Sequence, residues 1–377
     1  MSKSYTPGLK ILKNTVIRKE RKLPLKGDIN CSKGDAVKYN NVVASTFLPG
    51  NIHMVNVANQ LNVEPDTISD YLTVSLNQEV DKGDIIAENK GLFGFFKSQV
   101  ISPFKGKISN VSKRTGQIMV SEPEIPVEVN AYIDGSVIEV IDSEGVVIES
   151  QGALIQGIIG VGGEKSGYIE FLSESDMSKI KNNSLLDDRD FNDKIVVIEG
   201  FINKRIYDDL SSMGVAGIVA GGFDYQSLSD ILGYKLGVAI TGTEEISATL
   251  IVTEGFGKVK MSQKTYDILK ENNGNRASIN GATQIRAGVI RPELVISADS
   301  KVDSVAKEFD EMDLIIKEGS KVRVIREPHF GDIGIIKKLP TESVAIESET
   351  KARVAEVEFL NKKRKLVPRA NLEIILE

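Results

Sequence analysis

The first part of the chain repeats one local unit, in which a glycine turn, a short alternating strand, a polar turn and a second strand follow one another. Copies occupy residues 26–35, 105–116 and 134–145, and residues 81–88 supply a related half. Glycine is favoured at such turns because it reaches a positive φ at little cost. Alternation with a period of two buries one face of each strand. The repeat predicts a compact, duplicated β sandwich over residues 1–168.

The chain is long enough for more than one hydrophobic core. Its 377 residues suggest two or three domains of about 150 residues each. Charged residues make up 27% and hydrophobic residues 41%, which is ordinary globular usage, so we expect most of the chain to be ordered. No apolar run approaches the roughly 20 residues that span a bilayer, and the first residues lack the apolar core of a signal peptide. We therefore expect no membrane span and a cytoplasmic location.

Residue types that hold metals or perform acid–base chemistry are scarce. Cys31 is the sole cysteine, which excludes an internal disulfide and a multi-thiolate metal site. His53 and His329 are the only histidines, and they lie far apart in the sequence. We therefore expect no cofactor and no metal. The scarcity weighs against hydrolytic or redox catalysis but leaves an enzymatic role open.

Residues 80–87 (Val-Asp-Lys-Gly-Asp-Ile-Ile-Ala) and 100–111 (Val-Ile-Ser-Pro-Phe-Lys-Gly-Lys-Ile-Ser-Asn-Val) flank a predicted hairpin. This pattern resembles the biotinyl/lipoyl family, and without a modified lysine it resembles the N-terminal parts of RnfC- and NqrA-type electron-transport subunits. The resemblance implies a barrel-sandwich hybrid fold. Carrier members modify a lysine in the hairpin, but Lys90 and Lys97 lack the family's neighbours, so we expect neither to be modified. The flavin and iron–sulfur features of the electron-transport families have no counterpart in this sequence.

The end of that hairpin is aromatic, with Phe93, Phe95 and Phe96 close together. These rings either fold under the hairpin as core or form an exposed anchor for a protein partner, because contiguous exposed apolar surface commonly marks an interface. The sequence is consistent with both interpretations.

Glycines crowd residues 151–168, but their spacing fits neither the Walker pattern nor the dinucleotide fingerprint. We interpret this stretch as a close-packed turn or a domain boundary. The polar residues 169–193 then predict a connector.

Residues 194–298 alternate short apolar segments with amphipathic ones. Strands are predicted at 195–198, 215–220, 238–240 and 250–252, and helices at 203–212, 227–232 and 262–270. Asn203 can cap the first of these helices, and Gly214 can end it. Continuous apolar strands separated by helices predict an α/β domain with a mainly parallel sheet.

Ligands of such sheets favour the carboxyl ends of the strands. Backbone amides in the glycine-rich turns predicted there are candidates to hold an anion. The candidate residues are Gly221, Gly222, Thr241, Glu254, Gly255 and Gly257, with Arg286 and Arg291 as further positive charge. A catalytic interpretation would use Glu244, Glu245 or Glu254 as a base beside a threonine. The same glycines also suit ordinary tight turns between a strand and a helix.

After a predicted connector at 299–318, residues 319–339 resemble a KOW motif, with Gly334 at the family's glycine position. That family includes ribosomal proteins and NusG-type transcription factors, and the resemblance implies an SH3-like barrel over residues 319–377. Further strands are expected at 343–347, 352–359, 365–368 and 372–374. By alternation, Val322, Val324, Ile333 and Ile335 should point inward, and Lys321, Arg323 and Arg326 should lie nearer solvent.

The KOW resemblance implies binding to RNA, RNA polymerase or a ribosome, although small barrels also bind proteins. From residue 319 onward the chain has twelve Lys or Arg against nine Asp or Glu, whereas the whole chain carries a net charge of −6. Candidates for contact with phosphate or with a partner are Arg323, Arg326, Lys362, Lys363, Arg364 and Lys365.

The expected fold is multidomain α+β and β-rich, with a barrel-sandwich hybrid, a central α/β domain and an SH3-like barrel. We expect a bacterial family that unites these parts in a non-catalytic adaptor or scaffold for a macromolecular partner. Two alternatives stay open. One is an RNA-, ribosome- or RNA-polymerase-associated factor that acts through the KOW-type barrel, and the other is an enzyme or sensor that binds a small anionic ligand in the α/β domain.

Overall fold

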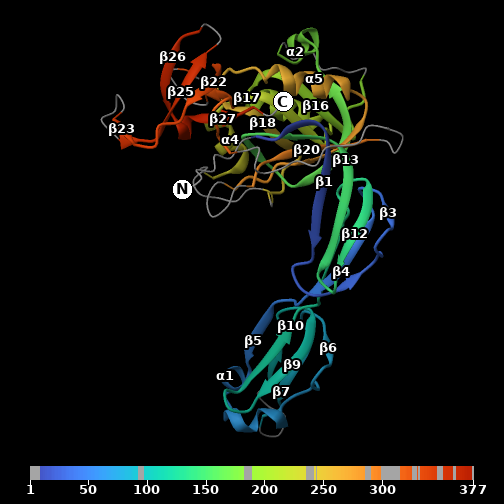
Figure 1. The fold of residues 1–377 in the computed structure, drawn as a ribbon. Helices are drawn as coiled ribbons and strands as arrows, with labels where there is room; N and C mark the ends of the chain where they lie inside the picture. Colours follow the sequence, from blue (N-terminus) through green and yellow to red (C-terminus); the bar gives the residue numbers. More distant parts are fainter. Residues whose placement is uncertain are drawn as a thin grey trace.

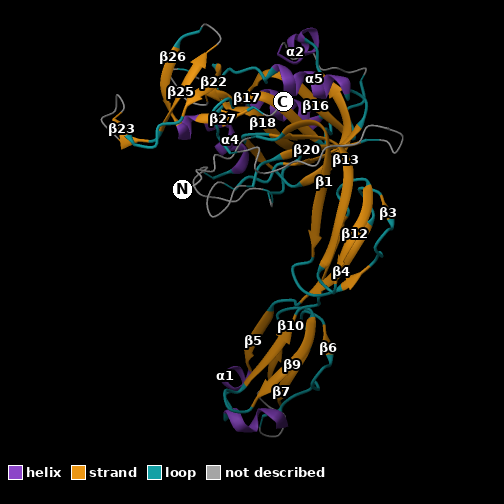
Figure 2. Cartoon of the chain, in the orientation of Figure 1, coloured by secondary structure: helices purple, strands orange, loops and turns teal. Residues whose placement is uncertain are grey.

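The computed structural model describes residues 9–91, 97–181, 189–234, 242, 244–284, 290–298, 315–324, 329, 332–345, 351–359 and 362–375. Strands account for 49% of these residues and helices for 15%. The strands form one large mixed sheet and several small sheets, and a slender arm extends from the large sheet (Figure 1, Figure 2). The expected β-rich fold is confirmed.

Four parallel strands form the middle of the large sheet. They are β15 (Glu164–Phe171), β16 (Lys194–Ile202), β17 (Gly217–Phe223) and β18 (Thr249–Phe256), side by side in this order. The strands beyond them run antiparallel, with β14 (Ile159–Val161) beside β18, and β19 (Arg276–Asn280), β20 (Glu293–Ser297) and β13 (Gly145–Gln156) beyond β15. The sheet is therefore mixed, and the expectation of a mainly parallel sheet holds only for its middle.

The sheet also begins earlier in the chain than residue 194. The strands β13, β14 and β15 belong to it, although the sequence places them in a region that ends at 168. The pairing of β13 with β20 joins residues more than a hundred positions apart, such as Gly152 and Ser297, so no local pattern signals it. The strand predicted at 238–240 lies outside the described residues.

Helices cover both faces of the parallel strands. The helices α2 (Glu174–Lys181), α3 (Lys204–Ser212) and α4 (Tyr225–Leu232) bury side chains in the core on one face. The helix α5 (Gln263–Glu271) buries Ile268 and Leu269 in the core on the other face. The Asn203 side chain accepts a hydrogen bond from the backbone nitrogen of Ile206, and Gly214 has φ +82°, so the predicted cap and stop of α3 are confirmed.

The described helices are short. The longest, α3 and α5, have nine residues each. None of the helices in the described part of the chain could span a bilayer.

The arm comprises residues 23–144 and leaves the large sheet between two long paired strands, β1 (Ile11–Lys22) and β13. Its middle section contains a three-stranded sheet of β11 (Ile125–Asn130), β4 (Val42–Leu48) and β2 (Asp28–Ile29). It also contains β12 (Gly135–Ile141) and β3 (Ala36–Val37), which extend the large sheet beyond β13. Val43, Ile133 and Val137 of this section share a core with Leu154 and Val295 of the large sheet. The middle section is therefore continuous with the large sheet through β12 and β3 and also packs against it.

The tip of the arm comprises residues 51–122 and is inserted between β4 and β11 (Figure 1). It contains β5 (Ile52–Asn56), α1 (Val57–Leu61), the 3-10 helix η1 (Pro65–Asp70), β6 (Glu79–Val80), β7 (Ile85–Asn89), β8 (Ser98–Ile101), β9 (Gly106–Ser112) and β10 (Gln117–Ser121). All the buried residues of its core, from Val55 to Val120, come from the tip itself. The tip thus has a hydrophobic core of its own.

Equivalent turns in the middle section and the tip support the internal repeat. Gly34 and Gly83 both follow a lysine and precede an aspartate, and their φ values are +97° and +99°. The carboxylates of Asp35 and Asp84 each accept a hydrogen bond of 2.8 Å from the backbone nitrogen three residues earlier. Glycine is required at these turns because both have a positive φ.

The arm is also fastened to the large sheet by an aromatic stack. The guanidinium of Arg276 on β19 lies over the rings of Tyr39 in the arm and Tyr168 on β15, at 4.7 and 4.3 Å from their centroids. Its Nη2 atom donates to Asp193 at 2.7 Å. Cation–π contacts of one guanidinium with a ring from each part hold the base of the arm against the sheet.

The C-terminal part forms a five-stranded antiparallel sheet, hereafter the C-terminal sheet, in the order β26-β25-β22-β21-β27. These strands are β21 (Lys321–Val324), β22 (Ile333–Lys338), β25 (Val354–Phe359), β26 (Arg364–Pro368) and β27 (Leu372–Ile374), and β23 (Val344–Ala345) pairs with β24 (Lys351–Ala352). The predicted inward positions of Val322 and Val324 are confirmed, but Ile335 is 43% exposed and Ile336 takes the inward place. The backbone at Gly334 packs against Val357, so Gly334 and Ile336 face inward. The inward positions of β22 are therefore shifted by one residue from the prediction.

Candidate functional site

The carboxyl ends of the parallel strands are the place where a sheet of this kind offers a ligand site. Both β16 and β18 carry a bulge there, because their registers with β17 shift between Ile198 and Phe201 and between Val252 and Gly255. Bulges redirect side chains and are common beside functional sites. Glu199 lies in the first bulge and Glu254 in the second.

The glycines expected to cradle an anion instead accommodate the chain itself. A Cβ atom at Gly221 would overlap the carbonyl oxygen of Glu199 and the backbone nitrogen of Met261. A Cβ atom at Gly222 would overlap the carbonyl oxygen of Gly257. Residues 257–261 therefore cross directly over the end of β17. A side chain at position 221 or 222 would overlap this crossing segment. Gly255 and Gly257 have φ values of +104° and +112°, so both serve the turn that leads into this crossing.

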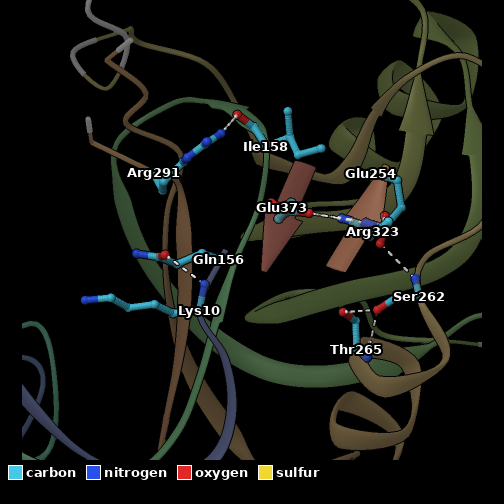
Figure 3. Close-up of polar contacts among 9 residues, drawn as sticks. All are labelled: Lys10, Gln156, Ile158, Glu254, Ser262, Thr265, Arg291, Arg323 and Glu373. Atoms are coloured by element: carbon cyan, nitrogen blue, oxygen red, sulfur yellow. Dashed lines mark hydrogen bonds and ion pairs between the residues drawn. The ribbon is translucent and has the colours of Figure 1, made fainter. Parts of the chain in front are cut away.

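The carboxylate of Glu254 is already bound by protein groups. Its side chain is 5% exposed, and its Oε1 atom accepts a hydrogen bond of 2.8 Å from the backbone nitrogen of Ser262 (Figure 3). The Ser262 hydroxyl caps α5 by accepting from the backbone nitrogen of Thr265 at 3.3 Å. Glu254 therefore supplies the negative charge that a ligand would otherwise bring to this helix start.

Arg323 of the C-terminal sheet is the cation that meets Glu254. Figure 3 shows its guanidinium between the carboxylates of Glu254 and Glu373, and its Nη2 atom lies 2.6 Å from Oε2 of Glu373. The three side chains are 13%, 5% and 7% exposed. Burial by itself would lower the pKa of Arg323, but the two carboxylates outweigh it and raise that pKa above its ordinary value.

The buried triad corrects two expectations. Arg323 was expected near solvent as a phosphate contact, but its side chain is only 13% exposed because it points from β21 toward the large sheet. Glu254 was expected to flank an anion, but it holds a cation of the same chain. Two candidates from separate predicted sites are thus brought together, and the C-terminal sheet is docked on the carboxyl ends of the parallel strands.

The segment around Thr241 lies away from this place. Glu244 accepts hydrogen bonds from the backbone nitrogens of Gly242 at 2.6 Å and Gly162 at 3.3 Å. Gly162 follows β14, which is antiparallel to β18, so Glu244 lies at the amino end of β18 and Glu254 at its carboxyl end. The structure does not bring them together. Thr241 and Arg286 lie outside the described residues, and Arg291 donates to the carbonyl oxygen of Ile158 at 3.3 Å (Figure 3).

The basic turn of the C-terminal sheet is exposed. Lys362 and Lys363 lie on the surface just before β26, and Arg364 and Lys365 are exposed at its first two positions. Arg364 is paired with Glu358 at 2.8 Å and with Glu356 at 3.5 Å, so its charge is partly balanced within the sheet. Arg326 lies outside the described residues.

The aromatic hairpin stays a prediction, because Phe93, Phe95 and Phe96 lie outside the described residues. Of the two hairpin lysines, Lys97 lies 3.7 Å from Glu88 of β7. In the described part of the chain, no three His, Cys, Asp or Glu side chains gather where they could hold a metal ion.

A groove of about 670 Å³, which the sequence did not predict, lies at the carboxyl ends of β15 and β16. Its lining includes Phe171, Glu199, Gly200, Phe201, Lys258 and Tyr266. These residues come from four separate segments, so only the strand-end position of residues 199–201 could have signalled the groove from the sequence.

Other exposed apolar groups gather on the arm. Among the described residues, seven large apolar side chains are more than half exposed. Six belong to the arm, and the seventh, Leu366, lies on β26; the six are Phe47, Ile52, Met54, Leu76, Ile101 and Ile125. No protein-family model matches the chain, and no curated protein matches it.

Proposed function

We propose that the chain is a non-catalytic scaffold that binds a macromolecular partner through the tip of its arm. The observation that carries the proposal is the apolar surface of β5. Ile52 and Met54 of this strand are 61% and 66% exposed. Exposed apolar groups gathered on one element commonly mark an interface.

The position of β5 adds to this argument. It forms one edge of the four-stranded sheet β5-β10-β9-β6, and edge strands leave backbone groups open to pairing with another chain. His53 and Val55 alternate with Ile52 and Met54, and Val55 is buried in the core of the tip. The apolar pair therefore lies on the outer face, where an added strand could pair with the edge and cover these side chains.

The other end of the molecule supports a non-catalytic role. A general base needs a carboxylate that can reach a substrate proton. Glu254 is instead buried between Ser262 and Arg323, and Glu244 accepts its hydrogen bonds at the opposite end of β18. Neither carboxylate is poised as a base in this arrangement.

The finer fold descriptions belong to the same proposal. The matching Lys-Gly-Asp turns of the middle section and the tip support a duplicated barrel-sandwich arrangement related to the biotinyl/lipoyl pattern. The strand order of the C-terminal sheet supports an SH3-like barrel of KOW type. In the proposal, Arg323 attaches this barrel to the large sheet through its ion pair with Glu254.

Site-specific crosslinking tests the scaffold proposal. A photo-reactive amino acid replaces Met54 in the full chain, which is expressed in the cells that normally make it, and adducts are identified by mass spectrometry. We expect one discrete adduct, and Ile52→Asp in the same chain should abolish it. The matched control places the reactive group at Asp142, an exposed turn position in the middle section.

The same experiment can refute the proposal. An identical adduct pattern at positions 54 and 142 would show unspecific capture. An adduct at position 54 that survives Ile52→Asp would show that the apolar outer face of β5 does not bind the partner.

A second candidate function is RNA binding through the exposed turn at residues 362–365. Lysines on such a turn can contact phosphates, and affinity would then fall steeply with salt. Replacing Lys362, Lys363 and Lys365 by Gln in the full chain should weaken RNA binding and flatten its salt dependence. RNA binding that is unchanged in this variant, or absent from the parent at low salt, would remove the candidate.

A further inference from the structure

The groove at the ends of β15 and β16 lies in the crevice that α/β sheets use for ligands. The helix α2 packs into the core on one face of the sheet through Met177 and Ile180. The helix α5 packs on the opposite face, where Tyr266 contacts the core. The groove lies between these two elements, just outside the carboxyl ends of the strands, as expected for a ligand crevice.

Aromatic rings form much of its wall. Phe171 at the end of β15 and Tyr266 of α5 meet edge to face, with ring centroids 5.5 Å apart. Phe201 lines the groove from the bulged end of β16, and all three rings are partly exposed. Small-molecule sites are typically concave and of this volume, and the lining of this groove combines these rings with polar and charged side chains.

Gly200 leaves the floor of the groove open. A Cβ atom at this position would meet no atom within 4 Å, and the backbone of Gly200 does not have a positive φ. Neither close packing nor backbone conformation therefore requires a glycine here, in contrast to Gly221 and Gly222. What the missing side chain does provide is space inside the groove.

The charged groups that line the groove are more basic than acidic. Lys258 and Lys260 approach from the segment that crosses over β17, and both are exposed. Lys260 is paired with Glu199 at 3.1 Å. Among the described residues, no carboxylate lies within ion-pair distance of Lys258, which leaves its charge for a ligand.

The start of α2 does not add to this charge. The Ser173 backbone nitrogen and hydroxyl donate to the carboxylate of Asp176, at 3.0 and 2.7 Å. Asp176 also pairs with Arg189 at 3.1 Å. The start of α2 is therefore already occupied by a carboxylate of the chain, and the charge of that carboxylate is balanced by Arg189.

We propose that the groove binds a small amphipathic anion, with an aromatic or acyl body against Phe171, Phe201 and Tyr266 and its charged group at Lys258. The inference concerns a different surface from the tip of the arm and does not depend on the scaffold proposal. A bound ligand would contact the segment 257–261. This segment follows β18, whose Glu254 pairs with Arg323.

A single tryptophan can report on the groove because the chain contains none. Tyr266→Trp in the full chain places a fluorophore in the groove wall. Two probes of similar shape are then compared, anionic anilinonaphthalene sulfonate and neutral N-phenylnaphthylamine. We expect saturable quenching of the tryptophan by both, with the anion bound at least about threefold more tightly, as for an exposed ion pair.

Two substitutions in this background make the test specific. Gly200→Leu should abolish quenching by both probes, because its side chain enters the groove without meeting the backbone. Lys258→Gln should weaken the sulfonate probe about threefold and leave the neutral probe unchanged, whereas the matched control Lys82→Gln on the arm should change neither. Unaltered binding in Gly200→Leu, or equal binding of both probes in the parent, would overturn the inference.

Discussion

At the scale of single residues, the ion triad of Glu254, Arg323 and Glu373 decides how the C-terminal sheet is attached. Each residue lies at a position that the sequence identifies as the end of a strand or as part of one. Their meeting was not predictable, because Arg323 and Glu254 are 69 residues apart and no local pattern encodes the contact. A buried cation between two carboxylates is costly to break, since removing one partner leaves buried charge uncompensated.

Arg323→Ala should therefore lower the free energy of unfolding of the C-terminal sheet by about 3 kcal/mol. Arg364→Ala is the matched control in the same sheet, because its pairs with Glu358 and Glu356 are exposed, and it should cost less than about 1 kcal/mol. Urea unfolding monitored by circular dichroism measures both. Equal losses in the two variants would contradict a docking role for Arg323.

Two glycines at neighbouring strand ends should respond in opposite ways to substitution. Gly222→Ala places a methyl group against the carbonyl oxygen of Gly257 and should destabilise by about 1–3 kcal/mol. Gly200→Ala has open space and ordinary φ, so stability should be unchanged or rise by up to about 1 kcal/mol. Thermal unfolding of both variants checks the contrast. A Gly222→Ala protein as stable as the parent would show that close packing does not require this glycine, and the turn would again be a candidate for ligand binding.

At the scale of secondary-structure elements, sequence reasoning succeeded where the signal is local. The cap at Asn203, the strands of the C-terminal sheet and the positive φ of Gly34, Gly83 and Gly116 agree with the prediction. The other glycines of the repeat do not have a positive φ and are instead closely packed against backbone; they are Gly27, Gly106, Gly135 and Gly145. Prediction failed where pairing is distant. The pairing of β1 with β13 joins residues such as Lys19 and Ile148, and this pairing, not the repeat alone, determines where the arm begins.

One carboxylate links the two ends of the tip where they meet the middle section. Glu122, just after β10, is bonded to His53 of β5 at 2.8 Å and to the Asn51 side chain at 2.9 Å. The hydrogen bond from His53, followed by that from Asn51, lowers the pKa of Glu122 below its ordinary value of 4.5. The resulting stabilisation is present above pH 4.5 and is lost as the pH falls through the lowered pKa.

The acid sensitivity of the tip should therefore depend on Glu122. Thermal unfolding of Glu122→Gln should lose less stability than the parent as the pH falls below 4.5. Glu124→Gln, an exposed neighbour, is the control and should follow the parent. If all three proteins show the same pH dependence, Glu122 does not stabilise the junction.

At the scale of the whole molecule, the structure separates two roles in space. The C-terminal sheet is joined to the large sheet through the triad, whereas the arm extends away from both sheets (Figure 1). The arm carries six of the seven described apolar side chains that are more than half exposed. Nesting makes this possible, because the tip is inserted in the middle section and the middle section is inserted between β1 and β13. The tip lengthens the arm and has a hydrophobic core of its own.

The nesting also provides the most direct test of the scaffold proposal. Leu48 and Ile125 are paired across β4 and β11, so an Asn-Gly turn between them should close a hairpin in place of the tip. The core of the tip shares none of its buried residues with the other cores, and the shortened chain should therefore stay folded, as circular dichroism can confirm.

Affinity purification of the full and shortened chains from the same cells, compared by quantitative mass spectrometry, is the decisive measurement. We predict that the full chain retains a specific partner and that the folded, shortened chain loses it. Retention of the same partner at the same level by the shortened chain would contradict the claim that the tip of the arm is the binding surface.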